Sequence, residues 1–141
     1  MKLKPNTKKK IDRKKLGKRS RNKGSSFERT IAKRFEEVLG VDFVRTPQSG
    51  GFAKNLDKTE GFRGDIVPAS KDVNFRLHIE CKNTKTWSLP AWLKQAQGDC
   101  PKGKIPVVIF HQHGTSNNYI TLNLEDFFSI IDDERIILEG E

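Results

Sequence analysis

Apolar positions recur along this chain with two periods, one of three to four residues and one of two. From residue 27 to residue 39 they follow helical spacing, as expected for one buried face of a helix. Ser25 or Ser26 is a suitable N-cap for that helix, and Gly40 is a suitable C-cap. The pattern therefore predicts a first helix over these residues.

Shorter apolar runs, bounded by turn residues, predict the remaining elements. A second helix begins at Ser88-Leu89-Pro90 and ends near Gly98, and a third begins at Asn123 or Leu124. The order is helix, three strands, helix, two strands, helix, which predicts an α/β fold with a central mixed β-sheet flanked by helices. Residues 135–138 are either an edge strand or a loosely packed end. The strands are predicted at 42–46, 64–68, 74–82, 106–110 and 119–122.

Basic residues are concentrated at the start of the chain. The first 24 residues hold twelve Lys or Arg and one acid, a net charge of +11, whereas the whole chain carries +9. Such a segment buries too little apolar surface to fold alone, so we expect residues 1–23 to be a disordered basic tail and residues 24–141 to be a single domain. The tail is expected to bind DNA in a salt-dependent way. Its expected DNA contacts are Lys8, Lys9, Lys10, Lys14, Lys15, Lys18, Arg19 and Arg21.

The composition argues against membrane and secreted proteins. The chain has no run of about 18 apolar residues that would span a bilayer, and no apolar N-terminal stretch typical of a signal peptide. Its two cysteines, Cys81 and Cys100, suggest no disulfide framework, which favours a reducing, cytoplasmic location. His111 and His113 do not match a zinc pattern with those cysteines, and they are expected to share one face of a strand end.

Candidate chemistry is found at Asp65 and, fifteen residues later, at Glu80-Cys81-Lys82. Each acid lies at an apolar run that reads as a strand, so neighbouring strands would bring two carboxylates and one ammonium group together. Glu80 and Lys82 point to the same face because they are two residues apart, whereas Cys81 points to the core. Two carboxylates repel each other unless a cation lies between them, and oxygen ligands suit Mg²⁺. This set suits metal-assisted hydrolysis of a phosphodiester.

The alternative interpretation is that Asp65 and Glu80 are ordinary charges at strand ends, because Glu-x-Lys alone occurs often by chance. Asp57 or Glu60 in the preceding loop would compete with Asp65 as a ligand, but neither is followed by an apolar strand. Arg63-Gly64 permits a close approach of the backbone where the Asp65 strand begins.

Four ordered motifs resemble the PD-(D/E)xK nuclease superfamily, and most of all the archaeal-type Holliday junction resolvases and related phage endonucleases. The resemblance extends from about Lys23 to Phe128. The motifs are Gly24-Ser25-Ser26-Phe27-Glu28-Arg29, Val44-Arg45-Thr46-Pro47-Gln48-Ser49-Gly50-Gly51, Gly64-Asp65-Ile66-Val67 and Ile79-Glu80-Cys81-Lys82.

The resemblance implies a role for each matching residue. Asp65 and Glu80 match the metal ligands, and Glu28 matches a helical acid that holds the metal directly or through water. Lys82 matches the lysine that positions the attacking water or stabilises the phosphorane. Ser49 matches a serine near the scissile phosphate. The DNA contacts added to those of the tail are Arg29, Arg45 and Arg63.

The resemblance further implies Mg²⁺ as cofactor, with Mn²⁺ able to substitute, no small-molecule cofactor, and branched or four-way DNA as partner. Paired cuts imply a homodimer. In two respects the chain departs from the family: Gly64 replaces the proline of the superfamily's name, and the Gly-rich loop 48–63 is long. A loop of that length in a small domain is functional or disordered.

Two other functions remain open. One is a nuclease of the same fold with another substrate, such as a nicking, repair or restriction-type enzyme. The other is a non-catalytic basic DNA-binding protein, which leaves the order of the motifs unexplained. At least one of Trp87 and Trp92 is expected to pack in the core, with a DNA-stacking or subunit contact as the alternative. Lys94 and Gln97 share a helix face that is either solvated or near the site.

Overall fold

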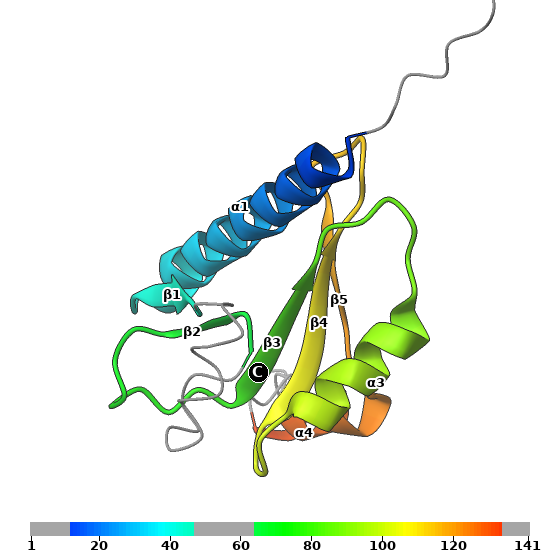
Figure 1. Ribbon diagram of the computed structural model, residues 1–141. Helices are drawn as coiled ribbons and strands as arrows, with labels where there is room; N and C mark the ends of the chain where they lie inside the picture. The colour runs from blue at the N-terminus through cyan, green and yellow to red at the C-terminus, as the bar shows by residue number, and fades with distance from the viewer. Residues whose placement is uncertain (1–11, 47–63, 134–141) are drawn as a thin grey trace, which may run out of the picture.

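The computed structural model describes residues 12–46 and 64–133. One sheet lies at the centre, with a long helix across one face and a shorter helix across the other (Figure 1). The sheet order is β1-β2-β3-β4-β5, which is the order of the strands in the sequence. The predicted α/β fold with a mixed sheet flanked by helices is confirmed. The strands are β1 (Phe43–Arg45), β2 (Ile66–Pro68), β3 (Leu77–Lys82), β4 (Ile105–His111) and β5 (Asn118–Thr121).

The helix α1 (Arg13–Leu39) is longer than the sequence predicted. It begins one residue after Asp12, whose side chain accepts hydrogen bonds from the backbone N–H groups of Lys14 at 3.1 Å and Lys15 at 3.3 Å. It ends at Gly40, in the left-handed conformation with φ 71°, as the predicted C-cap requires.

Two predictions about this region are therefore wrong. Ser25 and Ser26 lie inside α1 and do not cap it, and residues 13–23 are helical where a disordered tail was expected. Lys and Arg have high helix propensity, and the packed second half of α1 supplies the nucleus from which the helix extends. Lys8, Lys9 and Lys10 lie outside the described residues.

Three antiparallel pairings and one parallel pairing build the sheet. The parallel pair is β3 and β4, in which Glu80 lies opposite Val108 and Lys82 opposite Phe110. A parallel pair needs a crossover connection, and α3 (Leu89–Asp99) supplies it. The helix α4 (Leu124–Asp133) follows β5. Apart from the earlier start of α1, the predicted strands and helices are present with small shifts of their ends. Residues 48–63 and 135–138 lie outside the described residues.

The two faces of the sheet bury different sets of side chains. Ile66, Ile79 and Val107 pack with Phe27 and Ile31 of α1 in the main core. Cys81 packs against this core, as its place in the strand predicted. The opposite face carries buried Val67, Val108 and Phe110, and α3 covers it with Trp92 and the fully buried Ala96. Asp65, Glu80 and Lys82 belong to this second face, because they alternate with the core residues.

Candidate active site

A close approach of the backbone at Gly64 to strand β3 positions Asp65. Gly64 has φ 93°, and a Cβ at this position would lie 3.0 Å from the carbonyl oxygen of Ile79. The next residue, Asp65, donates its backbone N–H to that same oxygen at 2.7 Å, and its own carbonyl accepts from the N–H of Thr46 at 2.9 Å. Glycine is needed here because only glycine adopts this φ without strain and leaves room for β3. The close approach predicted for Gly64 is confirmed.

The carboxyl groups of Asp65 and Glu80 are both buried, with residue exposures of 6% and 9%. Burial and, after it, the charge of Glu80 raise the pKa of Asp65 to about 7, although a hydrogen bond to Asp65 from the N–H of Cys81 acts in the opposite direction. That hydrogen bond joins Cys81 N to Asp65 Oδ2 at 2.6 Å. Two adjacent buried carboxyl groups share a proton or bind a cation in preference to carrying two uncompensated charges.

Glu28 reaches the same region from α1 and is also buried. Its Oε2 accepts a hydrogen bond from Nε of Arg45, and its charge contributes to the raised pKa of Asp65. The predicted trio of Glu28, Asp65 and Glu80 is thus close in space. Within residues 12–46 and 64–133, however, no three His, Cys, Asp or Glu side chains form a ready-made metal cage. Arg45 engages one of the two carboxylate oxygens of Glu28.

Lys82 lies on the same strand face as Glu80, and its Nζ donates to Oε1 of Gln95 at 3.0 Å. Sequence reasoning singled out Lys94 and Gln97 on α3 and missed Gln95. The signal was available, since Gln95 lies three residues after Trp92 and one before buried Ala96, both on the side of α3 that meets the sheet.

His78 is a second residue that the sequence reasoning missed. It is 1% exposed, and its Nε2 lies 3.2 Å from Oε1 of Glu80 without the alignment of a hydrogen bond. Its position two residues before Glu80 put it on the same face, which was the available signal. A buried imidazole beside Glu80 restricts where that carboxylate can move.

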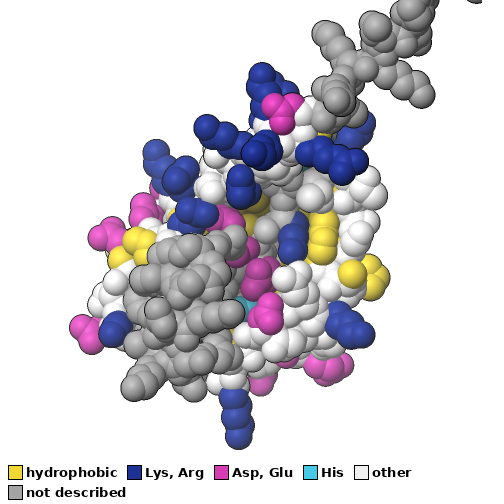
Figure 2. Space-filling model, viewed as in Figure 1, with side chains coloured by type: hydrophobic (Ala, Val, Ile, Leu, Met, Phe, Trp, Pro, Cys, Tyr) yellow, Lys and Arg dark blue, Asp and Glu magenta, His cyan; other side chains and the backbone are white. Residues whose placement is uncertain are grey.

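The basic residues predicted to bind DNA are distributed unevenly in the structure. Lys14, Lys15, Lys18, Arg19, Arg21 and Arg29 are exposed along α1. Figure 2 shows acidic side chains gathered near the centre of one face, with Lys and Arg side chains spread over α1 above them. Ser49, Arg63 and the competing acids Asp57 and Glu60 lie outside the described residues. Trp87 and Trp92 both pack against Phe110, with ring centroids at 4.9 and 5.9 Å.

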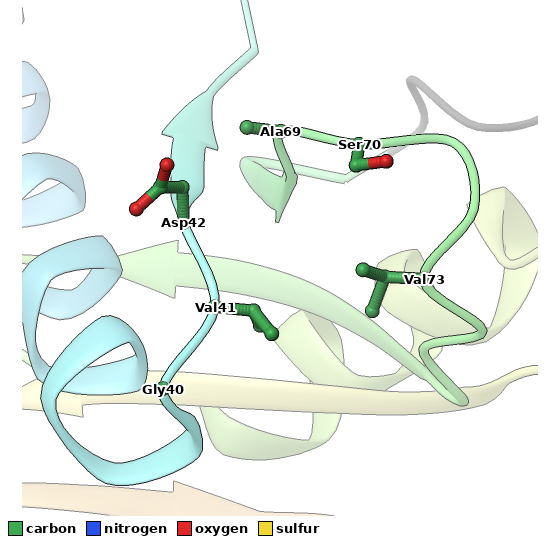
Figure 3. A pocket seen from close by; sticks show the side chains of 6 residues that line it. All are labelled: Gly40, Val41, Asp42, Ala69, Ser70 and Val73. Atoms are coloured by element: carbon green, nitrogen blue, oxygen red, sulfur yellow. The ribbon is translucent and has the colours of Figure 1, made fainter.

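A hollow at the C-terminal end of α1 has none of the basic side chains that would bind a phosphate among the described residues. Val41 and Val73 point toward each other across it, and the carboxylate of Asp42 points away (Figure 3). No basic side chain lines it among the described residues, so it does not suit a phosphate.

The mixed sheet, with the buried carboxyl groups of Asp65 and Glu80 and the nearby Lys82, is the arrangement expected of the PD-(D/E)xK class. The chain belongs to the family described as "Phage putative PDDEXK endonuclease", whose model matches residues 19–139. The search of curated proteins and the search of solved structures gave no match. No helix in the described part of the chain is long and apolar enough to cross a membrane.

Proposed function

We propose that this protein is a metal-dependent endonuclease that hydrolyses DNA phosphodiesters. The observation that carries the proposal is the buried pair of Asp65 and Glu80, where the start of β2 meets β3, with Lys82 on the same face as Glu80. When both of these buried carboxyl groups are charged, their mutual repulsion costs folding free energy. A pair kept at such a cost suits a cation that offsets the repulsion.

Asp65 and Glu80 are the residues that would hold the ion, Mg²⁺ or in its place Mn²⁺, and Glu28 would support it through water. Their buried oxygens fit a hard divalent cation. When bound, such an ion polarises the phosphate and lowers the pKa of a coordinated water. The remaining roles belong to the chain's own groups. Arg45 orients Glu28, and the ammonium of Lys82, fixed by Gln95, stabilises the negative charge that develops on the phosphorane.

For the substrate, we propose branched DNA such as a four-way junction, cut by a homodimer during recombination or repair in the cytoplasm of a phage-infected cell. Support comes from the motif order and from the exposed basic face of α1. A two-fold dimer would make the two matched cuts that a junction requires.

Cleavage of four labelled substrates tests this proposal: a four-way junction, a linear duplex, a single strand and a flap, each with Mg²⁺ and with EDTA. We expect paired symmetric nicks in the junction alone. Asp65→Asn and Glu80→Gln should lower cleavage on the order of 100-fold or more while DNA binding persists. Asp42→Asn, an exposed acid outside the site, is the matched control.

The outcomes separate the parts of the proposal. Full activity of either site variant contradicts the assigned roles. Cleavage of the other substrates as well, or a monomer on sizing with and without a junction, retains the nuclease and removes the junction specificity. Binding without cleavage under Mg²⁺ or Mn²⁺ contradicts the enzyme.

A further inference from the structure

A second polar hollow lies between α1 and the far ends of β3 and β4. Its volume is about 400 Å³, and it is open to solvent. Lys23, Ser26 and Thr30 line it from α1, and Asn83, His111 and Asn118 line it from the strand ends. It is distinct from the candidate active site, because Phe27 and His111 belong to the α1 side of the sheet.

Two basic side chains, Lys23 and His111, line this hollow, and two more, Lys85 and His113, lie close to them. The pKa of His113 is lowered by partial burial and by the nearby charges of Lys23, His111 and Lys85. No carboxylate of the described residues lines the hollow. Lys23 comes from α1, Lys85 from the loop after β3, His111 from β4 and His113 from the turn that follows. The two lysines give this region positive charge, which attracts an anion.

Both imidazoles are held with one nitrogen left for a ligand. Nδ1 of His111 lies 2.8 Å from Oδ1 of Asn118, and Nε2 of His113 lies 2.8 Å from Oδ1 of Asn83. Because an amide oxygen only accepts, each ring donates through that nitrogen. When protonated, each ring has a second N–H donor, and protonated imidazoles donate strong hydrogen bonds to phosphate oxygens.

The basic face of α1 leads into the hollow. Lys15, Arg19 and Lys23 are spaced four residues apart, which places them along one side of the helix at intervals of about 6 Å. At the other end, Asn83 lines the hollow and directly follows Lys82 of the candidate active site. A DNA strand that crosses the end of β3 would therefore contact both sites.

We propose that this hollow binds one backbone phosphate of the DNA substrate, at a position separate from the phosphate that is cut. The inference rests on the proposed function, since it takes DNA as the ligand. Lys23, His111 and the hydroxyl groups of Ser26 and Ser116 line the hollow, and Lys85 and His113 lie beside it. The two lysines supply charge, and the two imidazoles supply N–H donors. The ligand is a phosphodiester and not a free anion, because the basic face of α1 continues from the hollow.

The three histidines of the chain make this testable by NMR titration of the full-length protein with labelled imidazoles in EDTA, where no cutting occurs. A short DNA duplex should shift the ring signals of His113 and His111, because a bound phosphate accepts hydrogen bonds from their protonated rings. His78, on the opposite face, reports on the active site. Lys23→Ala should weaken the effect and lower the salt slope of DNA binding by about 0.9. Lys71→Ala, which removes an exposed charge elsewhere, should change neither histidine.

Three results would overturn the proposal: no change at His111 and His113 with saturating duplex, a change confined to His78, or a response to inorganic phosphate but not to duplex. None of these readouts depends on cleavage. A protein that shows the histidine response but cuts no DNA under Mg²⁺ contradicts the nuclease and retains this phosphate site. A protein that cuts DNA but shows no histidine response retains the nuclease and contradicts this phosphate site.

Discussion

The most constrained residue of the site is Gly64. It combines φ 93° with a Cβ position 3.0 Å from Ile79 O and 3.3 Å from Nδ1 of His78. Two costs therefore fall on any side chain there, one from the backbone conformation and one from the contact with β3. Both arise because Asp65 must donate to Ile79 while its carboxyl group accepts from Cys81.

Gly64→Ala should lower the free energy of unfolding by about 1–3 kcal/mol from backbone strain, plus the cost of the crowding. Gly103→Ala is the matched control, because Gly103 has φ 86° and nothing within 4 Å of its Cβ position. Urea unfolding of both variants measures the difference. Equal losses of unfolding free energy in the two variants would show that contact of the added Cβ with β3 does not destabilise the protein.

Period-two alternation was sufficient to place Glu80 and Lys82 on one face and Cys81 on the other. It did not identify His78 or Gln95, because alternation says which residues share a face and not which of them touch. The pairing of Arg45 with Glu28 likewise joins α1 to β1 and has no local signal. Residue spacing thus predicted the acids and the lysine but not the partners that orient them.

At the scale of elements, α1 is one helix with two environments. Its second half packs on the sheet through Phe27, Ile31 and Ala32, and its first half is exposed on every side. The sequence analysis missed the first half because it has no apolar period. The Asp12 cap and the helix-forming Lys and Arg residues were visible, but their weak local preference becomes decisive only when the packed half already exists.

Deletion of residues 1–22 should weaken DNA binding most at low salt and flatten its salt dependence, by about 0.9 log units for each duplex phosphate that the shortened chain no longer neutralises. The weaker binding should be accompanied by a decrease in helical circular dichroism, which removal of a disordered tail would not give. Binding isotherms over a salt series measure the slope. An unchanged slope would place this segment away from the DNA.

At the scale of the whole molecule, the two faces of the sheet bury different kinds of side chain. The α1 face supplies most of the buried apolar residues, and the α3 face tolerates two carboxyl groups at the expense of stability. The order of elements predicted a mixed sheet, but strand order and register depend on contacts between distant segments. Local patterns therefore could not specify them.

The folding stability should depend on pH through Asp65. Its pKa of about 7 is above the ordinary value of 3.8, so the folded state binds the proton more tightly than the unfolded state. The stabilisation is fully present below the unfolded pKa and is lost as pH rises through the folded pKa. Each pKa unit corresponds to about 1.4 kcal/mol, so the loss is on the order of a few kcal/mol.

Asp65→Asn should remove most of that dependence and be more stable than the natural chain above neutral pH. Urea unfolding across the acid-to-neutral range measures it, with Asp42→Asn as the control. Added Mg²⁺ should stabilise the natural chain and not Asp65→Asn, since a ligand stabilises the state that binds it. Parallel pH curves for both chains would contradict the assignment.

The backbone hydrogen bond from the N–H of Thr46 to the carbonyl oxygen of Asp65 affects which changes of sequence the family can tolerate. This hydrogen bond joins the two ends of the segment 47–63. The position of Asp65 therefore does not depend on how many residues that segment contains. Doubling a flexible connection costs only about 0.6 kcal/mol. Changes of length in this segment can therefore accumulate without moving Asp65, provided that Ser49 and Arg63, whose roles the family resemblance implies, are kept.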